Sequence, residues 1–325
     1  MVNLIRINAT GGPEVMQWES AELAEPKADE VQVRHTVIGL NFIDVYFRTG
    51  VYAAPQLPFT PGLEAAGVVE KAGAGVTDLR PGDRVAYASP PLGAYCQARN
   101  LPAARVVKIA DGIDDRTAAA IMLKGMTAHY LLRSAYRVKA GETILFHAAA
   151  GGVGLIACQW ARHLGVTVIG TVGSEEKAAL ARANGCAHVI DYNREDFVER
   201  VAEITDGAGV PVVYDSVGRA TFLPSLDCLK TRGTMVSFGQ SSGKVEPLDI
   251  GILNAKGALF LTRPSLFHYT ADRDELIYRA GEVFEAVVSG ALKISINQTY
   301  PLSEAAAAHE DLEGRRTTGS TVLLP

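Results

Sequence analysis

The sequence predicts an α/β protein that combines a doubly wound, Rossmann-type parallel sheet with a β-rich, barrel-like domain. Two observations indicate this fold class. Residues 1–124 contain short strands of alternating polarity, such as 30–37 and 64–70, and turn residues such as 80–84 separate them. Residues 125–264 alternate apolar strands with helical segments, which is typical of a parallel sheet covered by helices.

The clearest single motif is a glycine-rich turn between a strand and a helix. Residues 145–150 form an apolar strand and its exit, Gly151, Gly152, Val153 and Gly154 follow, and an apolar helix runs on through Leu164. Glycines allow the backbone to turn tightly and to approach a pyrophosphate, which binds the free N–H groups at the helix start. The strand and the helix on either side favour a dinucleotide-binding unit over an ordinary turn.

The second strand of this domain indicates which dinucleotide binds. It spans residues 166–173 and ends at Gly173 without the carboxylate that would hold the ribose 2′-hydroxyl of NAD. Ser174 and Lys177 follow, and a hydroxyl and an ammonium attract a 2′-phosphate. Ser174 is also a suitable helix N-cap, with Lys177 on a solvated face, and the two roles are compatible. The sequence therefore predicts NADPH rather than NADH.

The remaining elements complete the two predicted domains. Further strands are expected at residues 211–216, 234–239 and 259–262, followed by a helix over 274–289. The β-like tail at residues 319–324 is expected to pair with the first domain. We therefore predict a cofactor domain at 125–264, and a substrate domain at 1–124 that residues 265–325 complete.

Composition excludes several other classes of protein. Of the 325 residues, 48% are hydrophobic and 21% charged, as expected for a globular chain. The net charge of −5 argues against a nucleic-acid or anionic membrane surface as the main partner. No apolar run is long enough for a membrane span, and the start lacks a signal-peptide core, so a cytoplasmic location is expected. The four cysteines lie far apart in sequence and are expected to be reduced, and no metal site is predicted.

Ordered motifs along the whole chain then point to a known family. They are Gly39 to Asp44 with Tyr46, Pro61 to Gly67, Pro81 to Val85, Ala148 to Gly154, Tyr214 to Gly218, and Val236 to Gly239. With these motifs the chain closely resembles the zinc-free quinone oxidoreductases of the medium-chain dehydrogenase/reductase superfamily, the group that includes zeta-crystallin. The resemblance implies that the β-rich domain is GroES-like.

The same resemblance explains why no zinc site is expected. Zinc-dependent members of the superfamily place a cysteine and a histidine where this chain has Asn41 and Leu63. Leucine cannot bind a metal, and asparagine is a poor zinc ligand compared with a thiolate. Without a Lewis acid, a substrate that accepts electrons readily is implied, and quinones and activated enones both qualify.

Family resemblance also assigns roles to individual residues. Asn41 and Tyr52 are the expected catalytic residues, as hydrogen-bond donors to a quinone oxygen. Asn41 has the alternative role of capping its local turn, and Tyr52 that of packing. Thr127 is expected at the start of the first helix of the cofactor domain. The expected cofactor contacts are Phe42, Asp44, Tyr46, Thr127, Tyr130, Gly151, Gly152, Val153, Gly173, Ser174, Lys177, Tyr192, Ser216, Phe238, Gly239, Ser241 and Arg315.

Several of these contacts have alternatives. Tyr46 and Tyr130 could instead be packing residues, and Arg316 competes with Arg315 for the late arginine contact. Asp215, which ends the fourth strand beside Ser216, could equally cap the next helix.

The predicted activity is NADPH-dependent reduction of a quinone held in the interdomain cleft, by hydride or electron transfer. The alternative is an NADPH-dependent alkene or enone reductase with the same fold. A crystallin-like or RNA-binding role is a third hypothesis, which the acidic balance and the intact glycine-rich turn disfavour. The apolar strand at residues 259–262 is expected at a sheet edge, where pairing with a second copy would give a homodimer.

Overall fold

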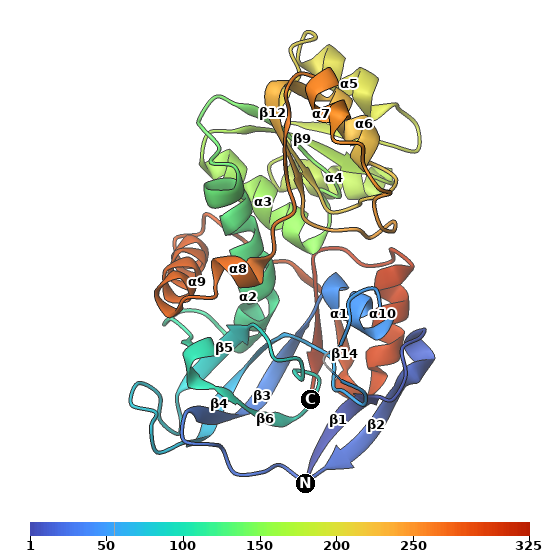
Figure 1. Cartoon of the computed structure of the whole chain (residues 1–325). Coiled ribbons are helices and arrows are strands. Elements are labelled where there is room, and N and C mark those ends of the chain that lie inside the picture. The colour runs from blue at the N-terminus through green and yellow to red at the C-terminus, as the bar shows by residue number, and fades with distance from the viewer. Residues whose placement is uncertain (55) are drawn as a thin grey trace. The chain divides into compact units, whose positions relative to one another are not determined.

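The computed structural model describes residues 1–54 and 56–325, which form two compact units (Figure 1). The first, here the β-rich unit, comprises Met1–Met126 and Thr270–Pro325. The second, here the Rossmann unit, comprises Thr127–Tyr269. The first boundary between the two units falls within a single helix, α2 (Asp115–Tyr130).

The β-rich unit is built on a seven-stranded sheet with the order β14-β15-β3-β4-β5-β7, in which β6 also pairs with β3. A separate hairpin joins β1 to β2. The predicted return of the tail is confirmed, because β15 pairs antiparallel with β3. The strands are β1 (Val2–Ile7), β2 (Met16–Ala21), β3 (Glu30–Leu40), β4 (Glu64–Ala72), β5 (Arg84–Ala88), β6 (Ala98–Pro102), β7 (Val107–Lys108), β14 (Ile296–Pro301) and β15 (Ser320–Leu324).

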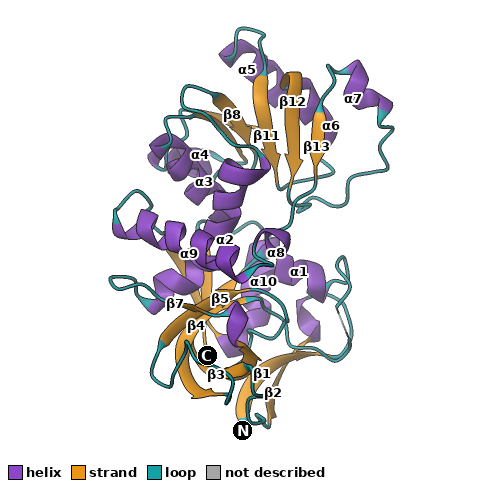
Figure 2. Ribbon diagram, turned by 60° about the vertical axis from the view of Figure 1, so that its left-hand side comes forward, coloured by secondary structure: helices purple, strands orange, loops and turns teal. Residues whose placement is uncertain are grey.

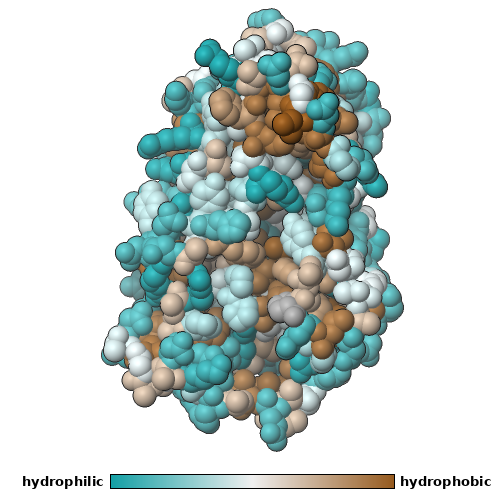
Figure 3. Space-filling model, viewed as in Figure 1, coloured by the Kyte–Doolittle hydropathy of each residue, from teal (hydrophilic) through white to brown (hydrophobic). Residues whose placement is uncertain are grey.

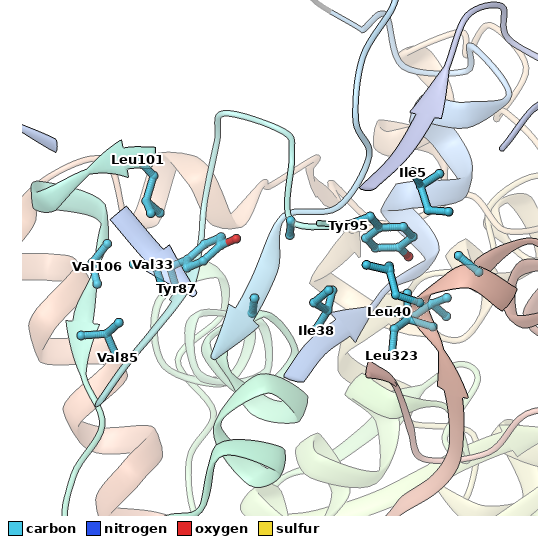
Figure 4. Close-up of a cluster of buried hydrophobic side chains, with 14 of the residues drawn as sticks. Ile5, Val33, Ile38, Leu40, Val85, Tyr87, Tyr95, Leu101, Val106 and Leu323 are labelled. Atoms are coloured by element: carbon cyan, nitrogen blue, oxygen red, sulfur yellow. The ribbon is translucent and has the colours of Figure 1, made fainter. Parts of the chain in front are cut away.

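The core of this unit lies between these strands and includes two fully buried tyrosines, Tyr87 and Tyr95 (Figure 4). Most residues of β3 are buried, among them Val31, Val33 and Ile38, and only Arg34 of this strand is exposed. Each tyrosine hydroxyl has a buried partner, because Tyr87 contacts His35 and Tyr95 contacts Asp44. The two aromatic rings thus fill the core while each hydroxyl group keeps a hydrogen-bond partner.

The helices of the β-rich unit include two that the sequence analysis did not predict. These are α1 (Phe42–Arg48), where a local turn was expected, and α10 (Ala305–Glu313). The expected helix over 274–289 is present as α9 (Arg273–Val288). The shorter turns are 3₁₀ helices at Pro13–Val15, Ala103–Arg105 and Leu302–Glu304.

The Rossmann unit has a six-stranded parallel sheet with the order β10-β9-β8-β11-β12-β13. Helices cover both faces, α3 and α4 on one side and α5 to α7 on the other (Figure 2). The strands are β8 (Thr143–Phe146), β9 (Thr167–Val172), β10 (His188–Asp191), β11 (Val210–Asp215), β12 (Leu229–Ser237) and β13 (Phe260–Thr262). The helices are α3 (Gly152–His163), α4 (Glu175–Ala183), α5 (Phe197–Ile204), α6 (Phe222–Asp227), α7 (Gly251–Ala255) and α8 (Leu266–Tyr269), and a π-helix at Leu131–Ala135 continues α2.

This strand order locates the ligand end of the unit. The chain moves outward from β8 through β9 to β10, then returns to β11 on the other side of β8. At such a switch point, ligands bind outside the carboxyl ends of the strands. The residues that follow β8, β9, β11 and β12 are therefore the candidates for ligand binding.

The thiols of the Rossmann unit differ from what their sequence spacing suggested. Cys158 on α3 and Cys186 before β10 are buried, and their Sγ atoms lie 3.3 Å apart. All four cysteines are free thiols. The contact raises the pKa of Cys158, and burial adds to the effect.

The described helices also bear on membrane association. None of them, in the part of the chain that the structure describes, combines the length and the apolar character needed to cross a bilayer.

Candidate active site

The glycine-rich turn after β8 has the backbone geometry of a phosphate-binding loop. Ala148 adopts φ 55°, and Gly151 is the N-cap of α3. A Cβ on Gly154 would lie 2.4 Å from the Ala148 carbonyl oxygen, so only glycine allows the helix to start this close to the turn. Gly151, Gly152 and Val153, which form the helix start, are half-buried. The first N–H groups of α3 have no acceptor within the helix and are suited to an anion.

The residues after β9 form a second polar corner of the Rossmann unit. Ser174 is the N-cap of α4, and its hydroxyl accepts a hydrogen bond from the backbone N–H of Lys177 at 3.3 Å. The predicted capping role is therefore confirmed. Tyr192 covers Gly173, because a Cβ there would lie 2.4 Å from the tyrosine oxygen. Gly173, Ser174, Lys177 and Tyr192 are thus brought together.

The ends of β11 and β12 are joined through Asp215. Its buried carboxylate accepts hydrogen bonds from the N–H groups of Val217 (2.7 Å) and Gly218 (3.2 Å). Its carbonyl oxygen accepts from Phe238 N–H at 2.7 Å. Asp215 therefore stabilises the loop that follows β11, whereas the next helix, α6, which it could have capped, has Thr221 as its N-cap.

The predicted cofactor contacts that follow β11 and β12 lie next to one another. The Ser216 carbonyl oxygen accepts from Ser241 N–H at 3.2 Å. A Cβ on Gly239 would lie 2.5 Å from the same carbonyl oxygen, so β12 can approach Ser216 this closely only with glycine. Ser216, Phe238, Gly239 and Ser241 therefore form one edge of the switch point.

A buried histidine after β8 contacts both β9 and α6. His147 follows β8 directly, and its ring nitrogens contact Thr171 Oγ1 at 2.9 Å and Ser225 Oγ at 2.8 Å. Burial lowers its pKa. The predicted packing role of His147 includes these two polar contacts.

Thr127 does not lie at the start of a helix, where it was expected. Helix α2 begins at Asp115, so Thr127 is in its last turns and not at its start. The apolar pattern of 118–130 continues across the predicted domain boundary, which hid the true helix start. Tyr130 is 2% exposed and stacks on Tyr269 with the ring centroids 4.5 Å apart. The alternative of helix packing thus applies to Tyr130.

In the β-rich unit, the predicted residues cluster at α1. Tyr46 contacts both Phe42 and Tyr52, with ring centroids 5.3 Å and 5.0 Å apart. Tyr46 is 9% exposed, whereas Phe42 and Tyr52 are half-buried. The three rings form an aromatic surface beside Asn41, the N-cap of α1.

Asp44 is fully buried in this unit. Its Oδ2 accepts from the Asn41 N–H at 2.9 Å and from the Tyr95 hydroxyl at 3.1 Å. Burial raises its pKa to about 7, against the effect of these hydrogen bonds. Asp44 thus belongs to the interior of the β-rich unit, together with His309, which contacts the same tyrosine at 3.0 Å. The sequence analysis gave it a place facing the cofactor because its neighbours Asn41 and Tyr46 share the motif.

A second buried carboxylate, Glu64, was not singled out from the sequence. It is 0% exposed, and its Oε2 accepts from Asn41 Nδ2 at 2.7 Å. Lys124 on α2 lies 3.6 Å from the same oxygen. A charged residue within the small, apolar run 61–67 was the available signal, because such a residue is buried only with partners.

Arg315 lies just beyond α10, at φ 57°. The neighbouring Arg316 forms an ion pair with Asp311, with Nε 2.6 Å from Oδ1. Glu313, at the end of α10, pairs with the buried Arg48 of α1 at 2.6 Å. The segment that carries Arg315 is therefore linked to α1, the helix of the aromatic surface, through the ion pair between Glu313 and Arg48.

The positions where zinc ligands would be expected hold other contacts. Leu63 is buried, and the Asn41 amide nitrogen is engaged by Glu64. Among residues 1–54 and 56–325, no group of three or more His, Cys, Asp or Glu side chains is arranged to hold a metal ion.

Comparison with known proteins places this fold and these motifs in a family. Residues 27–142 match the model of the alcohol dehydrogenase GroES-like domain, and residues 152–274 match that of the zinc-binding dehydrogenases. A quinone oxidoreductase of Pseudomonas aeruginosa is 54% identical, with both chains covered completely. A 2-haloacrylate reductase of a Burkholderia species is 48% identical, with 100% of this chain and 99% of the relative covered.

A solved structure agrees with the sequence comparison. The Escherichia coli quinone oxidoreductase in complex with NADPH is 51% identical, with a TM-score of 0.98 over 99% of this chain and 100% of the other. The sequence, the two domain matches and this structural likeness agree over the whole length. The chain therefore belongs to the quinone oxidoreductases of the medium-chain dehydrogenase/reductase superfamily.

Proposed function

We propose that this protein is an NADPH-dependent quinone reductase that works without zinc. The observation that carries the proposal is the corner after β9, where Ser174 and Lys177 stand in place of a carboxylate. A carboxylate there would repel a 2′-phosphate, whereas a hydroxyl and an ammonium attract it. The NADPH complex of the E. coli relative supports the same cofactor.

The residues of the Rossmann unit fit such a cofactor. The start of α3 at Gly151, Gly152 and Val153 would hold the pyrophosphate through backbone N–H groups. The surface of Gly173 beneath Tyr192 suits the adenosine ribose, with Lys177 and Ser174 at its phosphate. Other candidate contacts are Ser216, Phe238, Gly239 and Ser241 at the strand ends, Thr127 and Tyr130 on α2, and Phe42, Asp44, Tyr46 and Arg315 in the β-rich unit. Among these, the burial of Asp44 and of Tyr130 favours an indirect role.

NADPH supplies the reducing equivalents, and the protein's own contribution is mostly positioning. The aromatic surface of Phe42, Tyr46 and Tyr52, whose neighbouring rings are inclined at 63° and 60°, would offer apolar contacts to a quinone ring and exclude water from it. Tyr52 and Asn41 carry hydrogen-bond donors suited to the negative charge that develops on a quinone oxygen. These donors would supply the stabilisation that a Lewis acid gives in the zinc-dependent members of the superfamily.

The activity is tested by following cofactor oxidation at 340 nm with NADPH and NADH in parallel. The acceptors are 1,4-benzoquinone, 9,10-phenanthrenequinone and an enone. We expect turnover of both quinones with a clear preference for NADPH. A preference for NADH, or no quinone turnover, would overturn the proposal.

The cofactor preference is tested separately with Lys177→Met. Removing one ammonium from a 2′-phosphate costs about 1–2 kcal/mol, so the NADPH preference is expected to fall roughly tenfold or more while kcat/KM with NADH is unchanged. Lys139→Met, at an exposed residue before β8, is the matched control. Equal losses with NADPH and NADH would show that Lys177 does not contact the phosphate.

An enone reductase remains the second candidate, because the 48% identical relative is a 2-haloacrylate reductase. Both activities need the same cofactor and differ in the acceptor. Turnover of the enone alone in the 340 nm assay would favour this candidate.

We also propose that two copies associate through β13. This strand is at the edge of the sheet, and Phe260 and Leu261 on it are 61% and 40% exposed. In Figure 3 a hydrophobic patch covers the region of α7 and its neighbours, and Ile250, which precedes α7, is also highly exposed. Pairing of two edge strands would satisfy the open backbone groups and bury these side chains.

We also propose a cytoplasmic location, because all four cysteines are free thiols.

A further inference from the structure

The β-rich unit encloses the carboxylate of Glu64 completely, next to the proposed catalytic residue Asn41. Glu64 begins β4, and its side chain is 0% exposed. A Cβ on Gly39 of β3 would lie 2.3 Å from Glu64 Oε2, so a glycine makes room for this carboxylate. The absence of a side chain at Gly39 therefore leaves room for the Glu64 carboxylate beside β3.

Three groups of the β-rich unit approach the two carboxylate oxygens. Leu123 N–H donates to Oε1 at 2.6 Å, and Asn41 Nδ2 donates to Oε2 at 2.7 Å. Lys124 Nζ lies 3.6 Å from Oε2 and donates to the Leu40 carbonyl oxygen at 3.1 Å. Burial raises the pKa of Glu64, while the lysine and the hydrogen bonds lower it. Two N–H donors and one ammonium suit the ionised form, which can only accept hydrogen bonds.

These contacts fix the orientation of the Asn41 side chain. An ionised carboxylate requires the amide nitrogen, and not the oxygen, to face it. Asn41 is also the N-cap of α1, where the free N–H groups of the first turn favour an amide oxygen. Both neighbours demand the same orientation. The amide nitrogen carries a second N–H, which the bond to Glu64 does not use.

Stability alone is a poor explanation for this pair of charges. Glu64 and Lys124 have side chains 0% and 7% exposed, and burying both charges costs free energy that apolar side chains would not. In some proteins, buried ionic groups select one arrangement of their neighbours. Here that neighbour is Asn41.

We propose that Glu64 is a positioning residue, which holds the Asn41 amide so that an N–H, and not a carbonyl, is presented to the acceptor oxygen or the nicotinamide half of the cofactor. The inference rests on the proposed function for the identity of the ligand. The orientation of Asn41 does not depend on which acceptor is reduced.

The test uses Glu64→Gln, which has nearly the same shape. The introduced side chain can accept from Leu123 N–H with its amide oxygen, and its amide nitrogen then faces Asn41, which must turn its own oxygen inward. We expect kcat with NADPH and benzoquinone to fall roughly hundredfold or more, as for the loss of one oriented donor. Glu70→Gln, an exposed position on the same strand, is the matched control.

A double-mutant cycle separates positioning from a structural effect. Asn41→Ala, Glu64→Gln and the double variant are compared with the wild type for kcat, for NADPH affinity and for the urea midpoint of unfolding. If Glu64 acts through Asn41, Glu64→Gln lowers kcat when Asn41 is present and has no further effect in Asn41→Ala. Equal factors in both backgrounds would overturn the proposal, as would an unchanged kcat in Glu64→Gln.

A second variant covers the case in which Glu64→Gln does not fold because Lys124 is left unpaired. Glu64→Gln with Lys124→Met removes both charges, and the cycle is repeated from the wild type with this double variant in place of Glu64→Gln. The same dependence on Asn41 is expected, and its absence overturns the proposal. Wild-type assays come first. If the wild type reduces only the enone, the proposed function fails and the cycle is run on the enone, where it still decides the role of Glu64.

Discussion

At the scale of single residues, Gly173 shows how a missing side chain shapes a binding surface. The Tyr192 oxygen would lie 2.4 Å from a Cβ at this position. Tyr192 is 41% exposed, so in Gly173→Ala its ring can swing outward with little loss of fold stability. We expect the Kd for NADPH, measured by fluorescence titration, to rise about tenfold, equivalent to about 1.4 kcal/mol.

The control for this prediction is Tyr192→Ala, alone and combined with Gly173→Ala. If displacement of the ring is the cause, the alanine at 173 adds little once the ring is gone. Additive losses would instead indicate that the new methyl group obstructs the cofactor directly.

His35 predicts a measurable pH dependence of stability. Its Nδ1 contacts the Cys96 carbonyl oxygen at 2.7 Å, its Nε2 contacts the Tyr87 hydroxyl at 2.9 Å, and burial lowers its pKa to about 4. Between pH 6.5 and 4 the unfolded chain therefore binds a proton at this residue that the folded chain does not. The stability contributed by His35 is present above about pH 6.5 and is lost as the pH falls toward 4, by about 1.4 kcal/mol per pH unit.

His35→Gln removes this titration and can keep both hydrogen bonds. Urea unfolding at pH 7, 6 and 5 is expected to show the difference between wild type and variant shrinking as the pH falls. Parallel stability curves would mean that His35 is not the group that titrates.

Residue roles were predictable where neighbours in sequence cooperate. Ser174 caps a helix through Lys177, three positions on, and both residues could be identified by their spacing. Glu64 bonds to Asn41 and Leu123, which are distant in sequence and meet only when β3, β4 and α2 pack together. The Cys158 and Cys186 thiols meet in the same way. Such contacts depend on tertiary packing, which a single sequence does not specify.

At the scale of elements, buried apolar strands were predicted well and two short helices, α1 and α10, were not. Strand β11 is buried along its whole length and β12 over its last three residues, so the apolar composition of these segments reveals them. Helix α1 has seven residues and starts at an asparagine, which resembles a turn. Helix α10 begins with four alanines and has a weak apolar face. The start of α2 was missed because its apolar pattern crosses the boundary between the two units.

Asp215 links three elements, and its replacement tests how the strand ends are held. Asparagine in Asp215→Asn supplies one acceptor oxygen where the carboxylate has two, so an N–H of the loop at Val217 and Gly218 or the Thr221 hydroxyl loses its acceptor. We expect a loss of about 2–3 kcal/mol in the free energy of unfolding, because a buried donor is left unsatisfied. Urea titration measures it, with the exposed Asp111→Asn as control.

The same variant separates loop geometry from global stability. NADPH affinity is expected to fall in conditions where Asp215→Asn remains folded, because Phe238 and Gly239 depend on the same residue through its carbonyl oxygen. Unchanged affinity would show that the loop after β11 does not contribute to the cofactor site.

At the scale of the whole molecule, the edge of the Rossmann sheet predicts the state of association. Within the described chain, β13 is the last strand of its sheet and pairs with β12, and apolar side chains are exposed along it. An open apolar edge invites pairing, and a twofold pairing uses the same surface on both copies, which closes the assembly at two. We expect the wild type to sediment as a dimer of about twice the 34.6 kDa chain mass.

Phe260→Lys with Leu261→Lys tests this assignment, because each dimer would bury four added charges without partners. Sedimentation at micromolar concentration is expected to give a monomer, whereas Ile277→Lys, at an exposed apolar residue of α9, leaves the dimer intact. A monomeric wild type, or a dimer unaffected by the two lysines, would place the interface elsewhere or remove it. If the monomer retains NADPH binding, the Rossmann unit holds its cofactor without support from a second copy.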